Sequence, residues 1–430
     1  MPRMSEGPAT AEDGRFEALF RDYLEKKIWM AENFREFEED PRTWNEYLSG
    51  SVYQLLAQSP QPKEANIRNA IARIELLPDV LAAAREALDR PPLPVLETGI
   101  RQNRGVIAFY EKDLHELAGD SAQRSALKSA AERLLVELRK YQEYLEVDLR
   151  KRASADWRLG REKFNRKLQF ELGAESVADE VLAEAESEIA RVTNDMHVVA
   201  RQLWSRYFPG EPHPVDDTDG RHEAMTIYAI SPPPADWHAE QVESFLQEYN
   251  RHMLRILTIH EAYPGHYVQL AYSNREPSLV RRIIKSGVFI EGWAVYTEQM
   301  MLDQGYGQGD LGLRLTQLKF YLRAVANAIL DHCMHCTDMS DEDALQFLMN
   351  RAFQSEGEAR LKIIRAKQTS VQLSTYFVGR MALYRLRQQV QRQMGDEFDL
   401  GRYHESVLDH GSVPVRFLPE LVRARLSGPR

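Results

Sequence analysis

Two histidines and two glutamates in the second half of the chain have the residue types and spacing of a catalytic zinc site. Glu261 directly follows His260, His266 lies six residues after His260, and Glu291 lies 25 residues after His266. Zinc proteases commonly carry the motif H-E-x-x-H on one helix, with a third ligand further along the chain. Here the segment from the first histidine to the second is two residues longer than in that motif.

A proline and a glycine between the histidines decide whether both side chains can reach one ion. Successive residues of an α-helix are about 100° apart, so an unbroken helix would leave His266 roughly 120° away from His260. Pro264 disrupts a helix because it lacks an N–H, and Gly265 permits backbone conformations that other residues avoid. We therefore expect a Pro-Gly bulge that returns His266 to the face of His260. Imidazoles more than about 6 Å apart would contradict this hypothesis, because Zn–N bonds are near 2 Å.

The chemistry of such a site is hydrolysis of a carbonyl compound by an activated water molecule. The imidazoles of His260 and His266 and the Glu291 carboxylate would bind Zn²⁺ and leave a fourth position for water. The ion lowers the pKa of that water toward ~7, and Glu261 would take its proton and pass it to the leaving amine. The alternative is that His260 and His266 are ordinary helix-end histidines beside a Pro-Gly turn.

Other polar residues of the C-terminal half are weaker candidates for the same site. Glu298 lies seven residues after Glu291, on the same helix face. It could accept a hydrogen bond from a ligand histidine, or it could be a solvated surface charge. The phenol of Tyr376 could donate its proton to an oxyanion. Arg380 and Arg385 could bind a substrate carboxylate, although an arginine-rich chain offers many such groups.

The helix predicted over residues 322–335 carries two further pairs of side chains. Asp331 and His335 are four residues apart and could form a carboxylate–histidine pair, although a lone helical histidine is usually structural. Cys333 and Cys336 are the chain's two cysteines. A Cys-x-x-Cys pair can be a redox centre or half of a zinc site, but a four-cysteine site needs a second pair. Free thiols packed along a helix are therefore the favoured interpretation.

The composition is that of a water-soluble globular protein. Of the 430 residues, 43% are hydrophobic and 28% are charged, which suits a large buried core. The net charge of −10 argues against nucleic acid and anionic membranes as partners. The first thirty residues are polar and lack a secretory pattern, and no apolar run is long enough to span a membrane. We therefore expect a cytoplasmic protein, and the sequence does not indicate its oligomeric state.

Helical periodicity dominates the chain and predicts a mainly α fold. Residues 225–230, in an irregular proline-rich stretch, are the best strand candidate and would hold a substrate backbone by β-augmentation or merely cover the core.

We expect residues 1–154 to form an N-terminal helical region and one wall of a cleft. Residues 155–430 would form the helical catalytic region, joined to the first in one compact unit. The predicted helices span residues 15–37, 66–88, 104–117, 121–152, 177–207, 240–263, 278–303, 311–337, 341–353, 357–366 and 370–395.

Residues 257–266 (LTIHEAYPGH) and 291–298 (EGWAVYTE) resemble motifs of the family called domain of unknown function 885. Weaker matches extend over most of the chain: Leu159-Gly160…Phe164, Tyr228…Pro232, Asp331…His335, Gln372…Tyr376…Gly379 and His404…Leu408…Gly411…Pro414. The resemblance implies a helical zincin-like fold with a central cleft and a small β element, and a gluzincin-like zinc metallopeptidase. It also implies catalytic roles for Tyr376 and His335, and supporting or substrate-binding roles for Asp331 and Tyr228.

Three functions are compatible with these residues. The first is a zinc metallopeptidase that cleaves short peptides. The second is a metal-dependent amide or ester hydrolase, or a tailoring enzyme of small-molecule metabolism, which would use the same activated water. It is favoured slightly by Ser370-Val371, where the family often has Pro-Gly. The third is a non-catalytic helical binding protein with a relic metal site. Against it argue the four intact residues of the site, which are His260, Glu261, His266 and Glu291.

Overall fold

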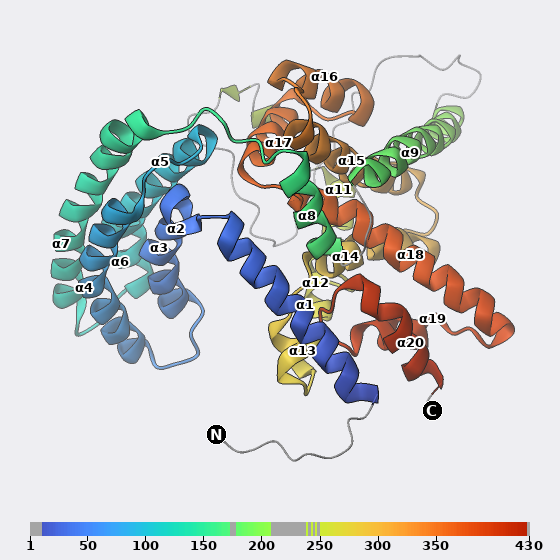
Figure 1. The fold of residues 1–430 in the computed structure, drawn as a ribbon, viewed down its shortest axis with the longest axis horizontal. Helices are drawn as coiled ribbons and strands as arrows, with labels where there is room; N and C mark the ends of the chain where they lie inside the picture. The colour runs from blue at the N-terminus through green and yellow to red at the C-terminus, as the bar shows by residue number, and fades with distance from the viewer. Residues whose placement is uncertain are drawn as a thin grey trace. The chain divides into compact units, whose positions relative to one another are not determined.

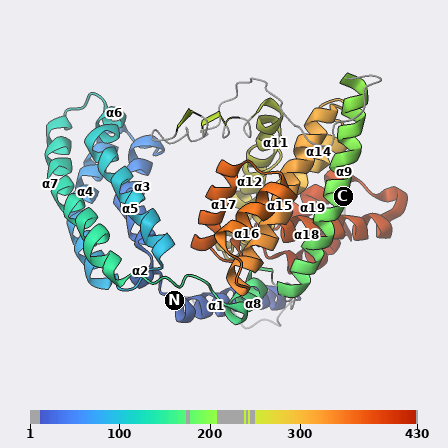
Figure 2. The same cartoon turned by 90° about the horizontal axis from the view of Figure 1, so that it is seen from above.

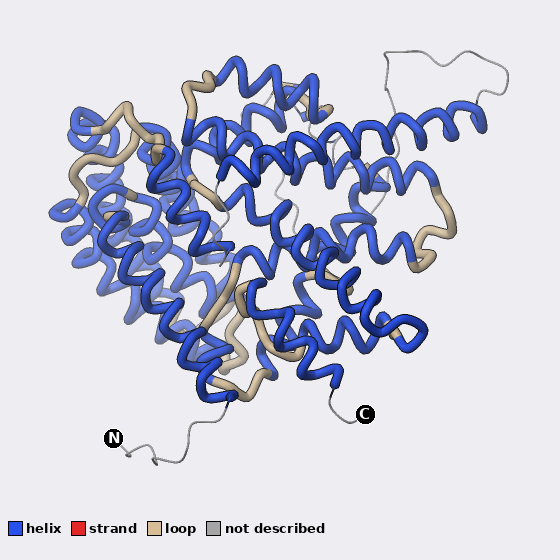
Figure 3. Tube along the Cα trace, turned by 45° about the vertical axis from the view of Figure 1, so that its right-hand side comes forward, coloured by secondary structure: helices blue, strands red, loops and turns tan. Residues whose placement is uncertain are grey.

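The computed structural model describes residues 11–172, 178–207 and 250–427, with a few isolated positions from 238 to 246. Within these residues the protein is mainly helical, as the periodicity predicts, and the described part of the trace in Figure 3 consists of helices and loops. The strand predicted over residues 225–230, with Tyr228, lies outside the described residues. The chain divides into two compact units, one formed by Glu25–Trp157 and the other by the residues on either side of it.

The unit formed by Glu25–Trp157 is a set of helices that lie side by side (Figures 1 and 2). Its core is aliphatic and aromatic, and the side chains of Leu48, Leu138 and Tyr110 are completely buried. This unit contains no residue of the predicted site. Its elements are the end of α1 (Ala11–Asn33), α2 (Glu36–Glu39), α3 (Pro41–Ala57), α4 (Lys63–Ala87), α5 (Leu93–Ala108), η1 (Phe109–Asp113), α6 (Leu114–Ala118), α7 (Arg124–Glu143), η2 (Tyr144–Leu149) and η3 (Arg150–Arg152).

The other unit is built around α15 (Leu311–Cys336), most of whose residues are buried on every face. Its many Leu and Ala residues favour a helix, and it packs against α9, α11, α16, α17 and α18 (Figure 2). The remaining elements are α8 (Arg161–Leu172), α9 (Ala178–Tyr207), α11 (Arg251–Glu261), α12 (His266–Arg275), α13 (Leu279–Ile283), α14 (Gly287–Asp303), α16 (Asp341–Ala352), α17 (Glu356–Gln368), η4 (Gln372–Ser374), α18 (Thr375–Met394), η5 (Gly395–Glu397), α19 (Leu400–Leu408), η6 (Val415–Phe417) and α20 (Leu418–Ser427).

Helices α14 and α18 cross with no side chain between their backbones. A Cβ atom on Gly379 would lie 1.9 Å from the carbonyl oxygen of Val288, and one on Gly292 would lie 2.4 Å from the Cα of Gly379. Only glycine allows so close an approach of two helices. The crossing lies next to Glu291 on α14, so it fixes the position of that carboxylate relative to the start of α18.

The two cysteines lie in the last turn of α15 as free, partly buried thiols. Burial raises the pKa of Cys333 above its ordinary value and raises the pKa of Cys336 to about 12. Both side chains therefore stay protonated at neutral pH, where a reactive or metal-binding cysteine would be a thiolate.

Candidate metal centre

A tight turn between α11 and α12 brings the two histidines together. Helix α11 ends at Glu261, the chain turns through a cis Tyr263–Pro264 peptide, and α12 begins at His266. The amide of Gly265 donates a hydrogen bond to the carbonyl of Ile259 at 2.9 Å. A Cβ atom on Gly265 would lie 1.8 Å from the carbonyl oxygen of His260, so the turn requires glycine.

The geometry that results is compatible with two ligands of one ion. The ring centroids of His260 and His266 are 4.8 Å apart and the rings are nearly perpendicular, at 89°. The separation is inside the limit of about 6 Å that two ligands of one zinc impose. The turn is also attached to the neighbouring helix, since the indole of Trp293 in α14 donates to the carbonyl of Pro264 at 2.9 Å.

Glu291 on α14 lies close to both histidines. Its Oε2 lies 3.8 Å from Nε2 of His260 and 3.4 Å from Nε2 of His266. A tetrahedral ion with bonds of about 2 Å holds its ligand atoms roughly 3.3 Å apart, so these distances leave room for zinc. A ligating atom of Glu261 also lies within 4.8 Å of one on each histidine. Residues of the right chemistry therefore surround one point, and they fit a zinc ion.

Glu298, two helical turns after Glu291 on α14, is completely buried and supports His260. Its Oε1 accepts a hydrogen bond from Nδ1 of His260 at 2.7 Å. That bond fixes the tautomer of the imidazole and leaves Nε2 to face the other ligands, which is the usual arrangement of a metal-binding histidine. Nδ1 of His266 has no such partner among the described residues.

The ionisation of this group follows from its burial and its opposite charges. Burial lowers the pKa of His260, but the carboxylates of Glu291 and Glu298 outweigh this and raise the pKa to about 10. Burial raises the pKa of Glu291, yet the two histidines lower it to about 2. Burial raises the pKa of Glu298. His260 therefore holds a proton at neutral pH, which a divalent cation has to displace.

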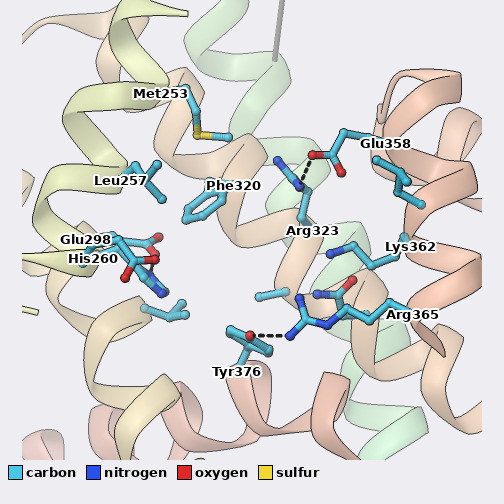
Figure 4. A pocket seen from close by; sticks show the side chains of 15 residues that line it. Met253, Leu257, His260, Glu298, Phe320, Arg323, Glu358, Lys362, Arg365 and Tyr376 are labelled. Carbon is cyan, nitrogen blue, oxygen red and sulfur yellow. Dashed lines mark hydrogen bonds and ion pairs between the residues drawn. The ribbon is translucent and has the colours of Figure 1, made fainter. Parts of the chain in front are cut away.

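A cavity of about 370 Å³ opens beside these residues (Figure 4). His260 and Glu298 lie on one side of it, and the exposed carboxylate of Glu261 contributes to the same lining. Tyr376, in the first turn of α18, also lines the cavity. Its hydroxyl accepts hydrogen bonds from Arg365 at 3.0 Å and from Gln372 at 3.3 Å. Burial raises the pKa of Tyr376, so its hydroxyl keeps the proton and can donate it.

Asp331 supports the turn that leads into Tyr376. Its buried carboxylate accepts hydrogen bonds from the backbone amides of Val371 and Ser374, both at 3.0 Å, and from the hydroxyl of Ser374 at 2.9 Å. Val371 adopts a φ of 68°, which is strained for a β-branched residue and needs such support. Asp331 is not part of the cavity lining, so it acts on the site through the position of α18.

His335 lies elsewhere in the core. Its Nε2 faces the carbonyls of Ala366 and Thr369 at 2.9 and 2.8 Å, and the amide of Leu159 donates to Nδ1 at 3.2 Å. The ring stacks on Phe164 at a centroid distance of 5.9 Å. These contacts join α8, α15 and α17, and the structure does not place His335 in the cavity that contains Glu261.

Arg380 is also a core residue. Its guanidinium lies 3.5 Å from the ring centroid of Tyr321 and 4.5 Å from that of Tyr384, and it donates to Gln299 at 2.6 Å. Arg385, its neighbour on α18, forms an ion pair with Glu184 on the surface. Neither arginine lines the cavity, so the structure does not bring them to a substrate there.

The cavity is lined by charged and polar residues that the sequence analysis missed. Arg323 and Asn327 come from α15, and Glu358, Lys362 and Arg365 come from α17. On each helix these residues are three, four or seven positions apart, which places them on one face. That spacing is visible in the sequence, but which face of α17 meets α15 is decided only by packing.

Comparison with known protein families identifies the family of this chain. Residues 8–219 and 209–422 match the family described as "Bacterial protein of unknown function (DUF885)", and the protein belongs to it. The family resemblance inferred from the motifs is therefore confirmed. No curated protein is similar to the chain in sequence.

Two solved structures share the fold. One is described as a "putative lipoprotein of unknown function" from Shewanella oneidensis; it is 28% identical with a TM-score of 0.75, over 96% of this chain and 88% of that one. The other is described as a "putative lipoprotein" from Colwellia psychrerythraea; it is 18% identical with a TM-score of 0.67, over 86% of this chain and 78% of that one.

These two structures correct the expected location. The cytoplasmic location predicted from the sequence is contradicted, because both similar proteins are described as a "putative lipoprotein", a membrane-anchored or extracytoplasmic class. Among the described residues no helix has the length and apolar character needed to cross a membrane. An acidic, polar composition suits a water-exposed domain on either side of a membrane, so composition could not discriminate between the two locations.

Proposed function

We propose that the protein is a zinc-dependent hydrolase, specifically a gluzincin-like metallopeptidase with a helical zincin-like fold that cleaves short peptides. The main support is the convergence of His260, His266 and Glu291 at distances that suit one zinc ion, with Glu298 behind the first histidine. The lipoprotein descriptions of the two similar structures support a place of action outside the cytoplasm.

The roles of the chain's own residues follow from their positions around the cavity. Zinc, when bound, would polarise the substrate carbonyl and lower the pKa of a water molecule. Glu261 is exposed to the cavity, next to the ligands, and would accept the proton of the attacking water and deliver it to the leaving amine. Tyr376 would donate a hydrogen bond to the carbonyl oxygen as negative charge develops there. Glu298 would hold the ring of His260 in one orientation.

Metal content and peptide hydrolysis test this function together. The purified protein should bind one zinc per chain and, when zinc-loaded, hydrolyse members of a library of short peptides. Glu261→Gln should keep the zinc and lose turnover by at least about a hundredfold, because it removes the proton acceptor. Glu405→Gln on α19, an exposed glutamate of the same unit, is the matched control and should be fully active. A zinc-loaded protein that leaves every peptide intact would rule out the peptidase.

A further inference from the structure

One wall of the cavity is basic. Arg323 comes from α15, and Lys362 and Arg365 come from successive turns of α17. Figure 4 shows Lys362 and Arg365 on the side of the cavity opposite His260 and Glu298. The same cavity therefore has a metal-type group at one side and a row of cations at the other.

The cations of this wall are not equally neutralised. Arg323 pairs with Glu358 at 3.0 Å, and both side chains are almost fully buried. Arg365 donates to two neutral groups, the hydroxyl of Tyr376 and the amide oxygen of Gln372. Lys362 makes no hydrogen bond or ion pair with any residue that the structure describes. Two of the three cations thus face the cavity without a carboxylate partner in the described chain.

The surroundings of Lys362 favour the arrival of an anion. Its side chain is partly buried, between Arg323 and Arg365. Burial and the nearby guanidinium of Arg323 lower the pKa of Lys362 to about 7, although the carboxylate of Glu358 acts in the opposite direction. Glu358, the nearest carboxylate, already pairs with Arg323, so a partly buried ammonium group at Lys362 is only partly compensated, and a bound anion would reduce its cost.

We propose that Lys362 and Arg365 bind the C-terminal carboxylate of a peptide substrate, so that the enzyme removes residues from the C-terminal end. This inference rests on the peptidase function proposed above. Arg365 contacts Tyr376, the residue that would hold the scissile carbonyl, so the anion lies close to the bond that is cut. Every peptide with a free C-terminus carries a terminal carboxylate. The number of bonds between this carboxylate and the last peptide bond is the same in all of them. Guanidinium and ammonium groups together are suited to a carboxylate.

Pairs of peptides that differ only at the C-terminus provide the test. A set of N-acetylated tripeptides is offered to the zinc-loaded protein as free acids and as C-terminal amides. We expect the acids to be hydrolysed with a kcat/KM at least about tenfold higher, since only the acids form charge-assisted hydrogen bonds with this wall. Lys362→Met should lower kcat/KM for the acids about tenfold, mainly through KM, and leave the amides unchanged. Lys362→Arg should restore most of the preference.

The other lysine of α17 supplies the matched control. Lys367 pairs with Asp341 and is not part of the cavity lining, so Lys367→Met should preserve the ratio of acid to amide hydrolysis. Equal hydrolysis of acids and amides by the wild-type protein would overturn the proposal. Selective hydrolysis of amides that carry an acidic side chain would also overturn it, because the anion would then be a side chain.

A binding experiment separates failure of this proposal from failure of the peptidase function. If neither acids nor amides are cleaved, the binding of N-acetyl-alanyl-alanine and its amide to the zinc-loaded protein is measured by calorimetry. Tighter binding of the acid, lost in Lys362→Met and kept in Lys367→Met, would support the carboxylate site in a protein that is not a peptidase. Equal binding of the two would overturn the site as well.

Discussion

Nδ1 of His260 donates a hydrogen bond of 2.7 Å to Glu298, a carboxylate that is 38 residues further along the chain and completely buried. The carboxylate reaches the imidazole only because α14 packs against α11. A bond of this kind fixes which ring nitrogen is free for a metal.

Removing that carboxylate should weaken metal binding. We expect Glu298→Ala to lower zinc affinity about 10- to 100-fold, the usual effect of losing the partner of a ligand histidine. Glu298→Gln keeps an acceptor oxygen and should lose less. Competition with a chromogenic chelator measures both, and an unchanged affinity in Glu298→Ala would mean that His260 is not a ligand.

Zinc binding should depend on pH through the proton on His260. Its pKa is raised to about 10, above the ordinary value of about 6.5, so the proton is present throughout the neutral range. Apparent zinc affinity should therefore rise as pH increases from 6 to 9, by up to about tenfold per pH unit. Calorimetry in buffers of different ionisation enthalpy should detect the release of about one proton per zinc at pH 7.5. A heat that is the same in every buffer would contradict this.

The raised pKa of His260 also predicts how the stability of the zinc-free protein changes with pH. The His260 interactions with Glu291 and Glu298 stabilise the fold fully below the unfolded-state pKa of about 6.5, and the contribution is lost as pH rises through about 10. The thermal midpoint of chelator-treated protein should therefore fall from pH 7 to pH 10. His260→Gln should show a flatter profile over that range.

The turn between α11 and α12 should not tolerate a methyl group. Gly265→Ala places a Cβ against the carbonyl of His260, so it should cost at least about 1–3 kcal/mol and reduce zinc binding. Gly105→Ala, in α5 where no atom lies within 4 Å of the added Cβ, is the control and should be neutral or slightly stabilising. Urea denaturation and zinc titration of both variants measure the difference. Normal zinc binding by Gly265→Ala would show that the turn does not set the distance between the histidines.

Asp331 should influence turnover through Tyr376. Tyr376→Phe is expected to lower kcat about 10- to 100-fold with zinc content unchanged, because it removes the hydrogen bond to the oxyanion. Asp331→Asn disturbs the turn at Val371 and Ser374 and should lower kcat as well. In the double variant the two losses should not add, since both act through the same phenol. Fully additive losses would mean that Asp331 acts independently of Tyr376.

The sequence predicted the helical class and the grouping of the histidines because these depend on local chemistry. Proline and glycine can be recognised as a break, and the break is what brings His266 to His260. The prediction begins a helix at residue 104, whereas α5 begins at Leu93 with Pro94 in its first turn, a position where proline is well tolerated.

Features that depend on tertiary contacts could not be predicted. The helix expected over residues 278–303 is interrupted between α13 and α14, where the amide of Ser286 bonds to the carbonyl of Ser412, far away in sequence. Likewise, Lys362 and Arg365 resemble any charged helical face until α17 packs against α15. Arg380 shows the opposite case, because an arginine near a motif proved to be buried between two tyrosines.

The contact of Gly292 with Gly379 makes the spacing of α14 and α18 a property of the main chain. Neither helix can be pushed outward or drawn inward by exchanging side chains at that crossing, because none are present there. The backbones of the two helices therefore fix the spacing between Glu291 on α14 and Tyr376 on α18. Changes in the shape or charge of the cavity would come more readily from α17, whose lining residues can change without disturbing that spacing.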